Sequence, residues 1–226
     1  MDLKKKKQIL LDELKSFGFS KNVIGAFSKV KRENFIPGNL KHLAYKDTAL
    51  PLGFGQTISQ PYTIAIMLDE LNIRKGQRVI EVGSGCGYVL ALLSELVGKK
   101  GKVYGMEIVK SLFEKSKRNL KDYENVEVYN QDGTKGLKEK AVSHEQKLKG
   151  GFDKGKLGSL YFDRVLISAR TEKIPKELIL QLKENGMLVA PIGNNIKQDL
   201  VVYEKKNGKL KIKKKIEGFM FVPLVG

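Results

Sequence analysis

The chain has 226 residues and a formal net charge of +17. This length suits a single domain built around one core. The one cysteine, Cys86, excludes an intramolecular disulfide framework. No apolar run approaches the roughly 18 residues that a membrane span needs, and Asp12 and Glu13 interrupt the basic start before a signal-peptide core can form. We therefore expect a soluble, cytoplasmic protein without a membrane partner.

Lysine side chains cluster at three places in the chain, 4–7, 99–102 and 205–215. Such density can attract nucleic acid. Few aromatic residues interleave with these lysines, and no recognition helix, zinc finger or RNA-binding motif is present. We interpret the lysines as a solvated surface and do not expect a nucleic-acid partner, although steering of an anionic partner stays open.

The first third of the chain has a helical pattern. Apolar residues recur at helical spacing from Leu3 to Phe17, Gly18 ends this segment, and Ser20 can cap a second helix. Further on, Ser59-Gln60-Pro61 precedes another apolar helical run, with Pro61 near its first position. The sequence therefore predicts an N-terminal helical segment ahead of the main body of the fold.

From residue 77 onward, short β-branched runs alternate with helical patterns. The predicted strands are 78–82, 103–107, 126–129, 164–168 and 187–192, and the predicted helices are 88–97, 111–122 and 176–185. Alternation of this kind is typical of right-handed βαβ units. It predicts an α/β fold with a doubly wound, mostly parallel, Rossmann-like sheet.

The pattern changes after Gly193. Three strand-like runs, 200–203, 210–216 and 219–222, follow one another without a helix, which predicts an antiparallel edge on the sheet. We expect one domain over 1–226, with N-terminal helices and a substrate-side loop over 1–60, a cofactor-binding core over 61–193 and the antiparallel edge over 194–226. Within the core, 135–160 is rich in lysine and glycine, which predicts an exposed insertion, with a short helix near 141–148.

A glycine-rich turn follows the first predicted strand of the core. Gly83, Gly85 and Gly87 stand at alternate positions after Glu81, and Tyr88 occupies the place where a dinucleotide fingerprint requires its last glycine. Glycine lets the backbone approach a small amino-acid moiety closely. S-adenosylmethionine carries such a moiety and has no pyrophosphate, so we expect this cofactor at Glu81, Gly83, Ser84, Gly85 and Gly87.

Two acidic positions extend the predicted cofactor site. Glu107 ends the next predicted strand, where a carboxylate can accept both ribose hydroxyls. Asp132-Gly133 follows the third strand, where an acidic side chain or a free amide could meet the adenine edge. Asp-Gly is also a common turn.

Several strings resemble one known family. They are Arg32-Glu33-Asn34-Phe35-Ile36-Pro37, Gly55-Gln56-Thr57-Ile58-Ser59-Gln60-Pro61, Ile174-Pro175-Lys176-Glu177-Leu178 and Phe221-Val222-Pro223-Leu224. They are similar to the signature regions of protein-L-isoaspartate (D-aspartate) O-methyltransferases, over nearly the whole chain outside 135–160. The resemblance implies a class I methyltransferase that moves a methyl group from S-adenosylmethionine to the free α-carboxyl of L-isoaspartyl and D-aspartyl residues in damaged proteins.

The resemblance also implies roles for single residues. Ser59 corresponds to the family's active-site serine, and Gln56, Thr57 and Ile58 are expected to reach the cofactor. A carboxylate is ionised at neutral pH and needs no general base, so Ser59 would position the acceptor. It could also cap the helix that starts at Pro61. Arg170 stands at a position where members of the family usually have a small, apolar residue. It could contact the substrate carboxylate or lie on the surface.

Other functions remain open from the sequence. A related class I methyltransferase acting on RNA would use the basic surface, and a noncatalytic adaptor could recognise isoaspartyl residues without cofactor chemistry. The intact glycines and Glu107 argue against the adaptor. We expect a monomer, and no metal site, because the chain has two histidines, one cysteine and no metal-ligand motif.

Overall fold

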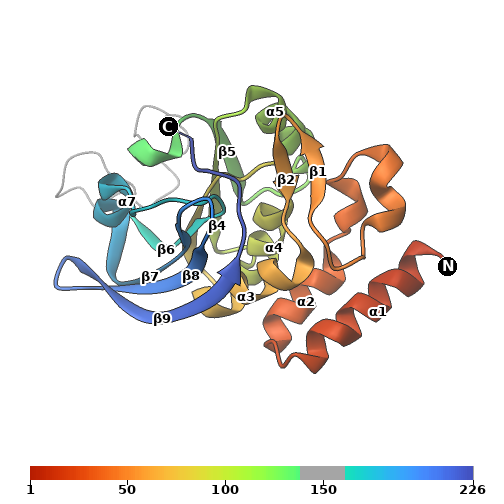
Figure 1. Ribbon diagram of the computed structural model, residues 1–226, viewed down its shortest axis with the longest axis horizontal. Helices are drawn as coiled ribbons and strands as arrows, with labels where there is room; N and C mark the ends of the chain where they lie inside the picture. The colour runs from red at the N-terminus through yellow and green to blue at the C-terminus, as the bar shows by residue number, and fades with distance from the viewer. Residues whose placement is uncertain (138–160, 226) are drawn as a thin grey trace.

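A computed structural model describes residues 1–137 and 161–225. Its centre is a seven-stranded sheet with the order β5-β4-β3-β6-β7-β8-β9 (Figure 1). The first five strands in this order pair in parallel, and β8 and β9 pair antiparallel. The predicted doubly wound, mostly parallel sheet with an antiparallel edge is therefore confirmed. The predicted short helix at 141–148 and nearly all of the 135–160 insertion lie outside the described residues.

The strands have the bounds β1 Leu50–Gly53, β2 Gln56–Ile58, β3 Arg78–Val82, β4 Lys102–Glu107, β5 Val126–Asn130, β6 Phe162–Ile167, β7 Leu182–Gly193, β8 Gln198–Lys206 and β9 Lys209–Phe219. The α-helices are α1 Leu3–Ser16, α2 Lys21–Lys29, α3 Pro61–Leu71, α4 Tyr88–Val97, α5 Lys110–Asn119 and α7 Lys176–Gln181. Short 3-10 turns are η1 Arg32–Asn34, η2 Gly38–Leu43 and η3 Gly133–Lys135. The division of this single domain into an N-terminal segment, a cofactor-binding core and an antiparallel edge, with boundaries at residues 60 and 193, stays a proposal.

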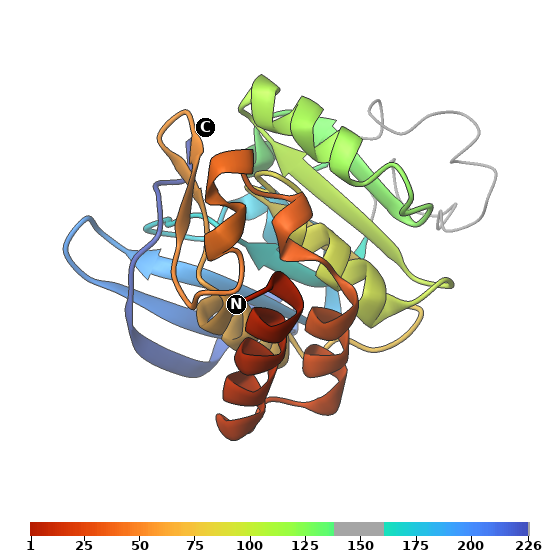
Figure 2. The same cartoon turned by 90° about the vertical axis from the view of Figure 1, so that its right-hand side faces the viewer.

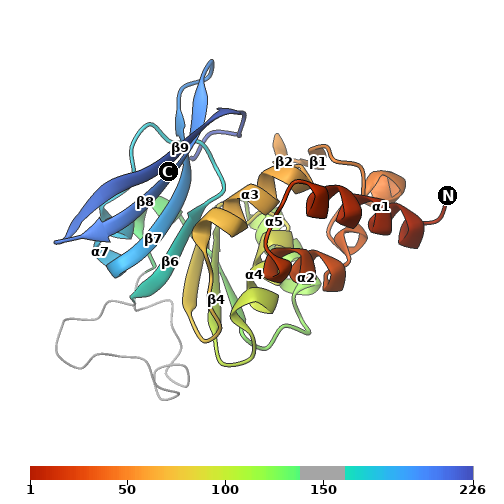
Figure 3. The ribbon, with the colours of Figure 1, turned by 90° about the horizontal axis from the view of Figure 1, so that it is seen from below.

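The two faces of the sheet carry separate apolar cores, because successive side chains of a strand point to opposite faces. Val79 of β3 and Val103 of β4 belong to the core shared with α1 to α4, whereas Ile80 and Tyr104 belong to the core shared with α7. Figure 3 shows α1 to α5 on one side of the sheet and α7 on the other. The central strands are thus buried on both sides, as their continuous apolar runs predict.

The N-terminal helices form as predicted. Ser20 is the N-cap of α2, where its hydroxyl accepts the Val23 N–H over 3.4 Å, and Gly18 after α1 has a φ of +83°. Figure 2 shows α1 and α2 side by side in front of the sheet. Leu10, Leu11 and Leu14 of α1 are buried there. This pair extends the core on the α4 side.

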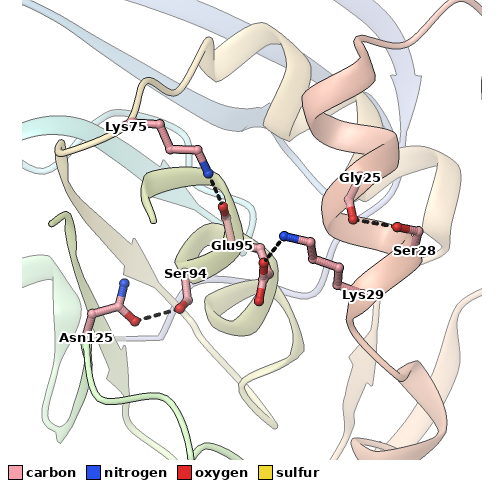
Figure 4. Close-up of polar contacts among 7 residues, drawn as sticks. All are labelled: Gly25, Ser28, Lys29, Lys75, Ser94, Glu95 and Asn125. Carbon is pink, nitrogen blue, oxygen red and sulfur yellow. Dashed lines mark hydrogen bonds and ion pairs between the residues drawn. The ribbon is translucent and has the colours of Figure 1, made fainter. Parts of the chain in front are cut away.

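Polar contacts fix the far end of α4, which begins at the glycine turn (Figure 4). Lys29 of α2 forms an ion pair with Glu95 over 3.0 Å, and Lys75 donates to the Glu95 carbonyl over 2.6 Å. Ser94 donates to Asn125 over 2.6 Å, in the segment before β5. Three separate parts of the chain therefore hold α4, and with it the glycine turn.

Several predicted elements have different boundaries in the structure. The helix predicted to reach residue 185 ends at Gln181, because Leu182 enters the sheet and pairs with Phe162 of β6. Both Leu178 and Leu182 are fully buried, so the apolar spacing was correct although the backbone changes conformation between them. The strand predicted over 219–222 is also wrong: β9 already contains Phe219, and the chain beyond it leaves the sheet edge and pairs with Arg170 through Pro223.

One hairpin was not predicted from the sequence. β1 and β2 pair antiparallel around a tight turn at Gly53-Phe54-Gly55, in which all three residues have positive φ values. This hairpin occupies what we expected to be a substrate-side loop. Among the described residues, no helix is long and apolar enough to cross a membrane.

Candidate active site

The chain reverses its direction across the sheet at the carboxyl ends of β3 and β6. These strands are parallel neighbours, with β4 and β5 on one side and β7 on the other. In open α/β sheets, ligands bind at such a switch point, outside the carboxyl ends of the strands. The glycine turn follows β3 at this point, and Ser168 follows β6.

Two cavities meet here. An outer cavity of about 340 Å³ lies over the glycine turn, and an inner cavity of about 40 Å³ is lined by Ser59. Both are lined by Thr57, Gly83, Gly85 and Ser168. The outer cavity is also lined by Gln56, Val82, Met106, Glu107, Ile108, Val109, Leu112, Gln131, Gly133, Ala169 and the C-terminal residues 222–225. The inner cavity is also lined by Leu52, Ile58, Ser59, Ile64, Met67, Glu81, Ser84, Cys86, Tyr88, Val89 and Leu166.

The three glycines of the turn are required for different structural reasons. All have positive φ values, of +77°, +54° and +86° for Gly83, Gly85 and Gly87, a region that favours glycine. A Cβ on Gly85 would have only Leu52 nearby, at 3.7 Å, so this backbone is open to the cavities. A Cβ on Gly87 would lie 2.7 Å from Leu120, beside α5. Gly87 therefore permits close packing, and it does not line either cavity.

Glu107 is held firmly at the end of β4. One carboxylate oxygen accepts the Gly85 N–H over 2.7 Å, and the other accepts the Val109 N–H over 2.8 Å. The residue is 6% exposed and lines the outer cavity. Each carboxylate oxygen keeps a further lone pair for a hydroxyl donor. This arrangement suits the predicted ribose contact, which stays a prediction.

Glu81 is a second buried carboxyl group, on β3 in the wall of the inner cavity. Ser168 donates to its Oε1 over 2.6 Å, and its Oε2 has no hydrogen-bond partner in the structure. Burial raises the pKa of Glu81 to about 8, while the Ser168 hydrogen bond opposes this rise and the Glu107 carboxylate adds to it. The buried Ser84 hydroxyl also lacks a partner. Buried polar groups are normally hydrogen-bonded, so these atoms suit a polar ligand in the inner cavity.

Ser59 lines the inner cavity, close in sequence to α3 but outside its cap. The N-cap of α3 is Gln60, and the Tyr62 N–H in the first turn is taken by Asp47 over 2.8 Å. The idea that the Ser59 side chain caps this helix is therefore wrong. Asp47 reaches the helix from a loop that precedes it, and Ser59 itself lines the inner cavity.

The segment after β5 contributes differently from the prediction. Asp132 caps η3, where its Oδ1 accepts the Thr134 N–H over 2.9 Å, and it pairs with Lys135 over 3.0 Å. It does not line either cavity, whereas Gly133 lines the outer one. Gln131 lines it too and was missed, because a lone glutamine after a strand carries no distinctive pattern.

The C-terminal segment was also missed as part of the site. Residues 222–225 line the outer cavity. Gln198 holds this segment in place, since its side chain accepts the Phe221 N–H over 2.7 Å and donates to the Phe221 carbonyl over 3.3 Å. The Arg170 N–H donates to the Val222 carbonyl over 2.8 Å. The Arg170 guanidinium is 3.5 Å from the Gly193 carbonyl and half-buried.

The comparisons with known proteins agree with this geometry. Residues 4–144 and 153–226 match the family model of protein-L-isoaspartate(D-aspartate) O-methyltransferase. The chain is 38% identical over 229 residues to protein-L-isoaspartate O-methyltransferase 2 of Archaeoglobus fulgidus, covering 100% of this chain and 95% of that protein. It is 39% identical over 223 residues to the protein-L-isoaspartate O-methyltransferase of Methanothrix thermoacetophila, covering 98% and 95%.

Solved structures with this name share the fold. One protein-L-isoaspartate O-methyltransferase superposes with a TM-score of 0.83 at 28% identity. The superposition covers 97% of this chain and 66% of that chain. A beta-aspartate methyltransferase from Plasmodium falciparum, solved in complex with S-adenosyl-L-homocysteine, superposes with a TM-score of 0.77 at 28% identity and covers 96% of both chains. The chain therefore belongs to the protein-L-isoaspartate(D-aspartate) O-methyltransferase family.

Proposed function

We propose that this protein transfers a methyl group from S-adenosylmethionine to the free α-carboxyl of L-isoaspartyl and D-aspartyl residues in damaged proteins. The observation that carries this proposal is that two cavities lie side by side at the switch point and share four lining residues. The outer one suits a nucleoside, and the inner one is lined by Ser59. The relatives' names point to the same reaction.

The residues of the outer cavity fit the cofactor. Gly85 leaves open space above the turn, and Glu107 is fixed by two backbone N–H groups so that it presents its remaining lone pairs. Gln131 and Gly133 line the part of the cavity that suits adenine, together with apolar Ile108 and Leu112. A volume of about 340 Å³ is in the range of small-molecule sites. When bound, S-adenosylmethionine supplies an activated methyl group on a sulfonium.

The inner cavity fits the reacting end of the ligands. Glu81 and Ser84 carry buried oxygens without partners, which can bind the polar amino-acid end of the cofactor. Ser59 lines the same cavity and can donate its hydroxyl hydrogen to the acceptor carboxylate. Gln56 lines the outer cavity, Ile58 lines the inner cavity and Thr57 lines both, so this strand of the hairpin suits contacts with the cofactor.

The chain needs no general base for this reaction. A carboxyl group with a pKa near 4 is already ionised at neutral pH. Catalysis then consists of holding the acceptor oxygen in line with the methyl group and excluding water, which can supply several kcal/mol. An unactivated serine is a poor nucleophile, so Ser59 acts as a hydrogen-bond donor that positions the acceptor.

The test is a pair of peptides that differ in one linkage. An isoaspartyl peptide and its normal aspartyl twin are incubated with methyl-labelled S-adenosylmethionine, and base-labile ester is counted. We expect label on the isoaspartyl peptide alone. Equal labelling of both peptides, or none, contradicts the proposal. Binding without labelling would instead favour a noncatalytic adaptor.

The proposal also covers the cellular location, the oligomeric state and the partners of the protein. We place the protein in the cytoplasm as a monomer that acts on aged proteins, with no nucleic-acid partner. The exposed lysines of β9 support a solvated edge, since charged side chains protect an edge strand from pairing with other chains. A salt titration of RNA binding tests the RNA-methyltransferase alternative, which predicts saturable binding that weakens steeply with salt.

A further inference from the structure

The guanidinium of Arg32 lies directly behind the wall of the inner cavity. Its Nη1 donates to the Ser59 carbonyl over 3.0 Å, and its Nη2 donates to the Thr48 carbonyl over 3.3 Å. It lies over the Tyr88 ring, 5.2 Å from the centroid. Arg32 is 0% exposed, and two of its contacts, Ser59 and Tyr88, line the cavity. In the sequence, this arginine is recognisable only as part of a family motif.

No carboxylate among the described residues forms an ion pair with Arg32. None of the ion pairs between described residues involves it, and its Nε has no hydrogen-bond partner. Burial lowers the pKa of the Arg32 guanidinium, while Tyr88, Cys86 and Asp47 oppose this. The Asp47 carboxylate is already bound to the Tyr62 N–H and the Gln60 side chain.

A buried charge without a close partner is unfavourable for folding. Arginine nevertheless stays protonated in proteins, so a positive potential persists behind Ser59. This potential is weakly screened because the intervening medium is protein and not water. The hydrogen bond to the Ser59 carbonyl also polarises the Ser59–Gln60 peptide. In a trans peptide the Gln60 N–H is directed away from that carbonyl, and thus away from Arg32.

We propose that Arg32 is a positioning residue that makes this site selective for an ionised carboxyl acceptor. The inference rests on the function proposed above. Arg32 acts through the Ser59 peptide and through its field, without touching the substrate. A neutral group of the same shape, such as a carboxamide, would gain nothing from this field, whereas a carboxylate held beside Ser59 is attracted by it.

The chemistry of the reaction determines which kinetic constant Arg32 should affect. The acceptor oxygen forms a bond to the methyl carbon as the carbon–sulfur bond breaks, and the electron pair of that bond stays on sulfur. The acceptor changes from an anion to a neutral ester. The field therefore favours the bound acceptor more than the ester, so its removal should raise KM for the peptide without lowering kcat.

The experiment compares two ligands that differ only in this charge. Kd is measured for an isoaspartyl peptide and for the same peptide with its α-carboxyl converted to an amide, both in the presence of S-adenosylhomocysteine. We expect Arg32→Met to lower the preference for the acid over the amide by roughly tenfold. Arg32→Lys, which keeps the charge, should retain most of the preference. The Kd for S-adenosylhomocysteine shows that each variant is folded.

Arg164 provides a matched control, because it is another buried arginine bound to backbone carbonyls. It is 7% exposed and donates to the Leu71 carbonyl over 2.7 Å, at the opposite end of β6 from Ser168. Arg164→Met should lower Tm and leave the acid-to-amide preference unchanged.

Several outcomes would overturn the inference about Arg32. An unchanged preference in Arg32→Met does so, as does equal weakening of both peptides, which indicates a purely structural role. If Arg32→Met does not fold, the lysine variant decides, because loss of the preference in Arg32→Lys contradicts an effect of charge. Failure of the proposed function is separate, since it would appear as absent labelling by the unaltered protein.

Discussion

The backbone N–H of Gly85 donates to the Glu107 carboxylate over 2.7 Å. This bond joins the glycine turn after β3 to the end of β4, so the residues expected to hold the two halves of the cofactor form one rigid unit. The second oxygen of Glu107 is held by Val109 over 2.8 Å. The side chain therefore cannot rotate away when the cavity is empty, and little ordering is needed on binding.

Replacing Glu107 tests this arrangement. Glu107→Ala should weaken cofactor binding by roughly 10- to 100-fold, since two hydrogen bonds of about 1–1.5 kcal/mol each are lost. Glu107→Gln keeps one oxygen and should lose less. Isothermal titration calorimetry with S-adenosylhomocysteine measures both, and Glu124→Ala, at an exposed position, is the control. An unchanged Kd in Glu107→Ala would place the ribose elsewhere.

Ser59→Ala should lower kcat by about 10- to 100-fold, the size of effect that follows loss of one positioning donor. The Kd for the cofactor should stay the same, because Ser59 lines the inner cavity only and the proposed role of its hydroxyl is a contact with the acceptor. Steady-state kinetics with an isoaspartyl peptide and calorimetry separate the two quantities. Ser16→Ala, on the exposed end of α1, should alter neither. A variant that loses cofactor affinity but keeps kcat would reverse the proposed role.

Glu81 should make stability depend on pH. Its pKa is about 8 in the folded protein, against an ordinary value of 4.5, so the folded state binds more protons between these values. The free energy of unfolding then falls as pH rises from about 4.5 to about 8, by up to about 1.4 kcal/mol per pH unit. Glu81→Gln cannot ionise, so it should gain stability relative to the natural protein across this window.

Denaturant unfolding at intervals between pH 5 and pH 9 measures this difference for Glu81→Gln. Glu124→Gln serves as the exposed control and should follow the natural protein at every pH. Parallel curves for Glu81→Gln and the natural protein would mean that the Glu81 carboxyl is ionised throughout.

Gly87→Ala should destabilise the fold by more than about 3 kcal/mol, because strain at positive φ adds to overpacking. The new Cβ would lie 2.7 Å from Leu120. Gly208→Ala isolates the backbone contribution, since Gly208 has a φ of +73° and nothing within 4 Å of its added Cβ. It should lose only about 1–2 kcal/mol. Thermal unfolding checks both, and equal losses would refute the packing role of Gly87.

Gln198→Ala should release the C-terminal segment from the outer cavity. The side chain is 2% exposed, and two of its hydrogen bonds join it to the Phe221 backbone. We expect faster hydrogen exchange at residues 221–225 and weaker cofactor binding, by roughly tenfold for two lost hydrogen bonds. Gln8→Ala, on the exposed face of α1, is the control. Faster exchange with an unchanged Kd would show that the segment does not contact the cofactor.

Local sequence patterns determined much of the secondary structure and part of the candidate site of this protein. The alternation of short β-branched runs with helical runs predicts the parallel strands and their connecting helices, because side-chain periodicity reflects which face of an element is buried. The glycine turn was identifiable for a similar reason, since positive φ values at Gly83, Gly85 and Gly87 are a property of each residue and its neighbours. The family motifs drew attention to Ser59.

Only the tertiary structure decided how distant segments complete the site. Asp47 caps α3 and frees Ser59, Gln198 brings the C-terminal segment to the outer cavity, and Arg32 reaches the Ser59 carbonyl from 27 residues away. The shortened α7 has the same origin, because Leu182 gains a partner strand in β6. Periodicity reports burial along one element, whereas these contacts depend on which elements pack together, and that is set by the sum of many weak interactions across the folded chain.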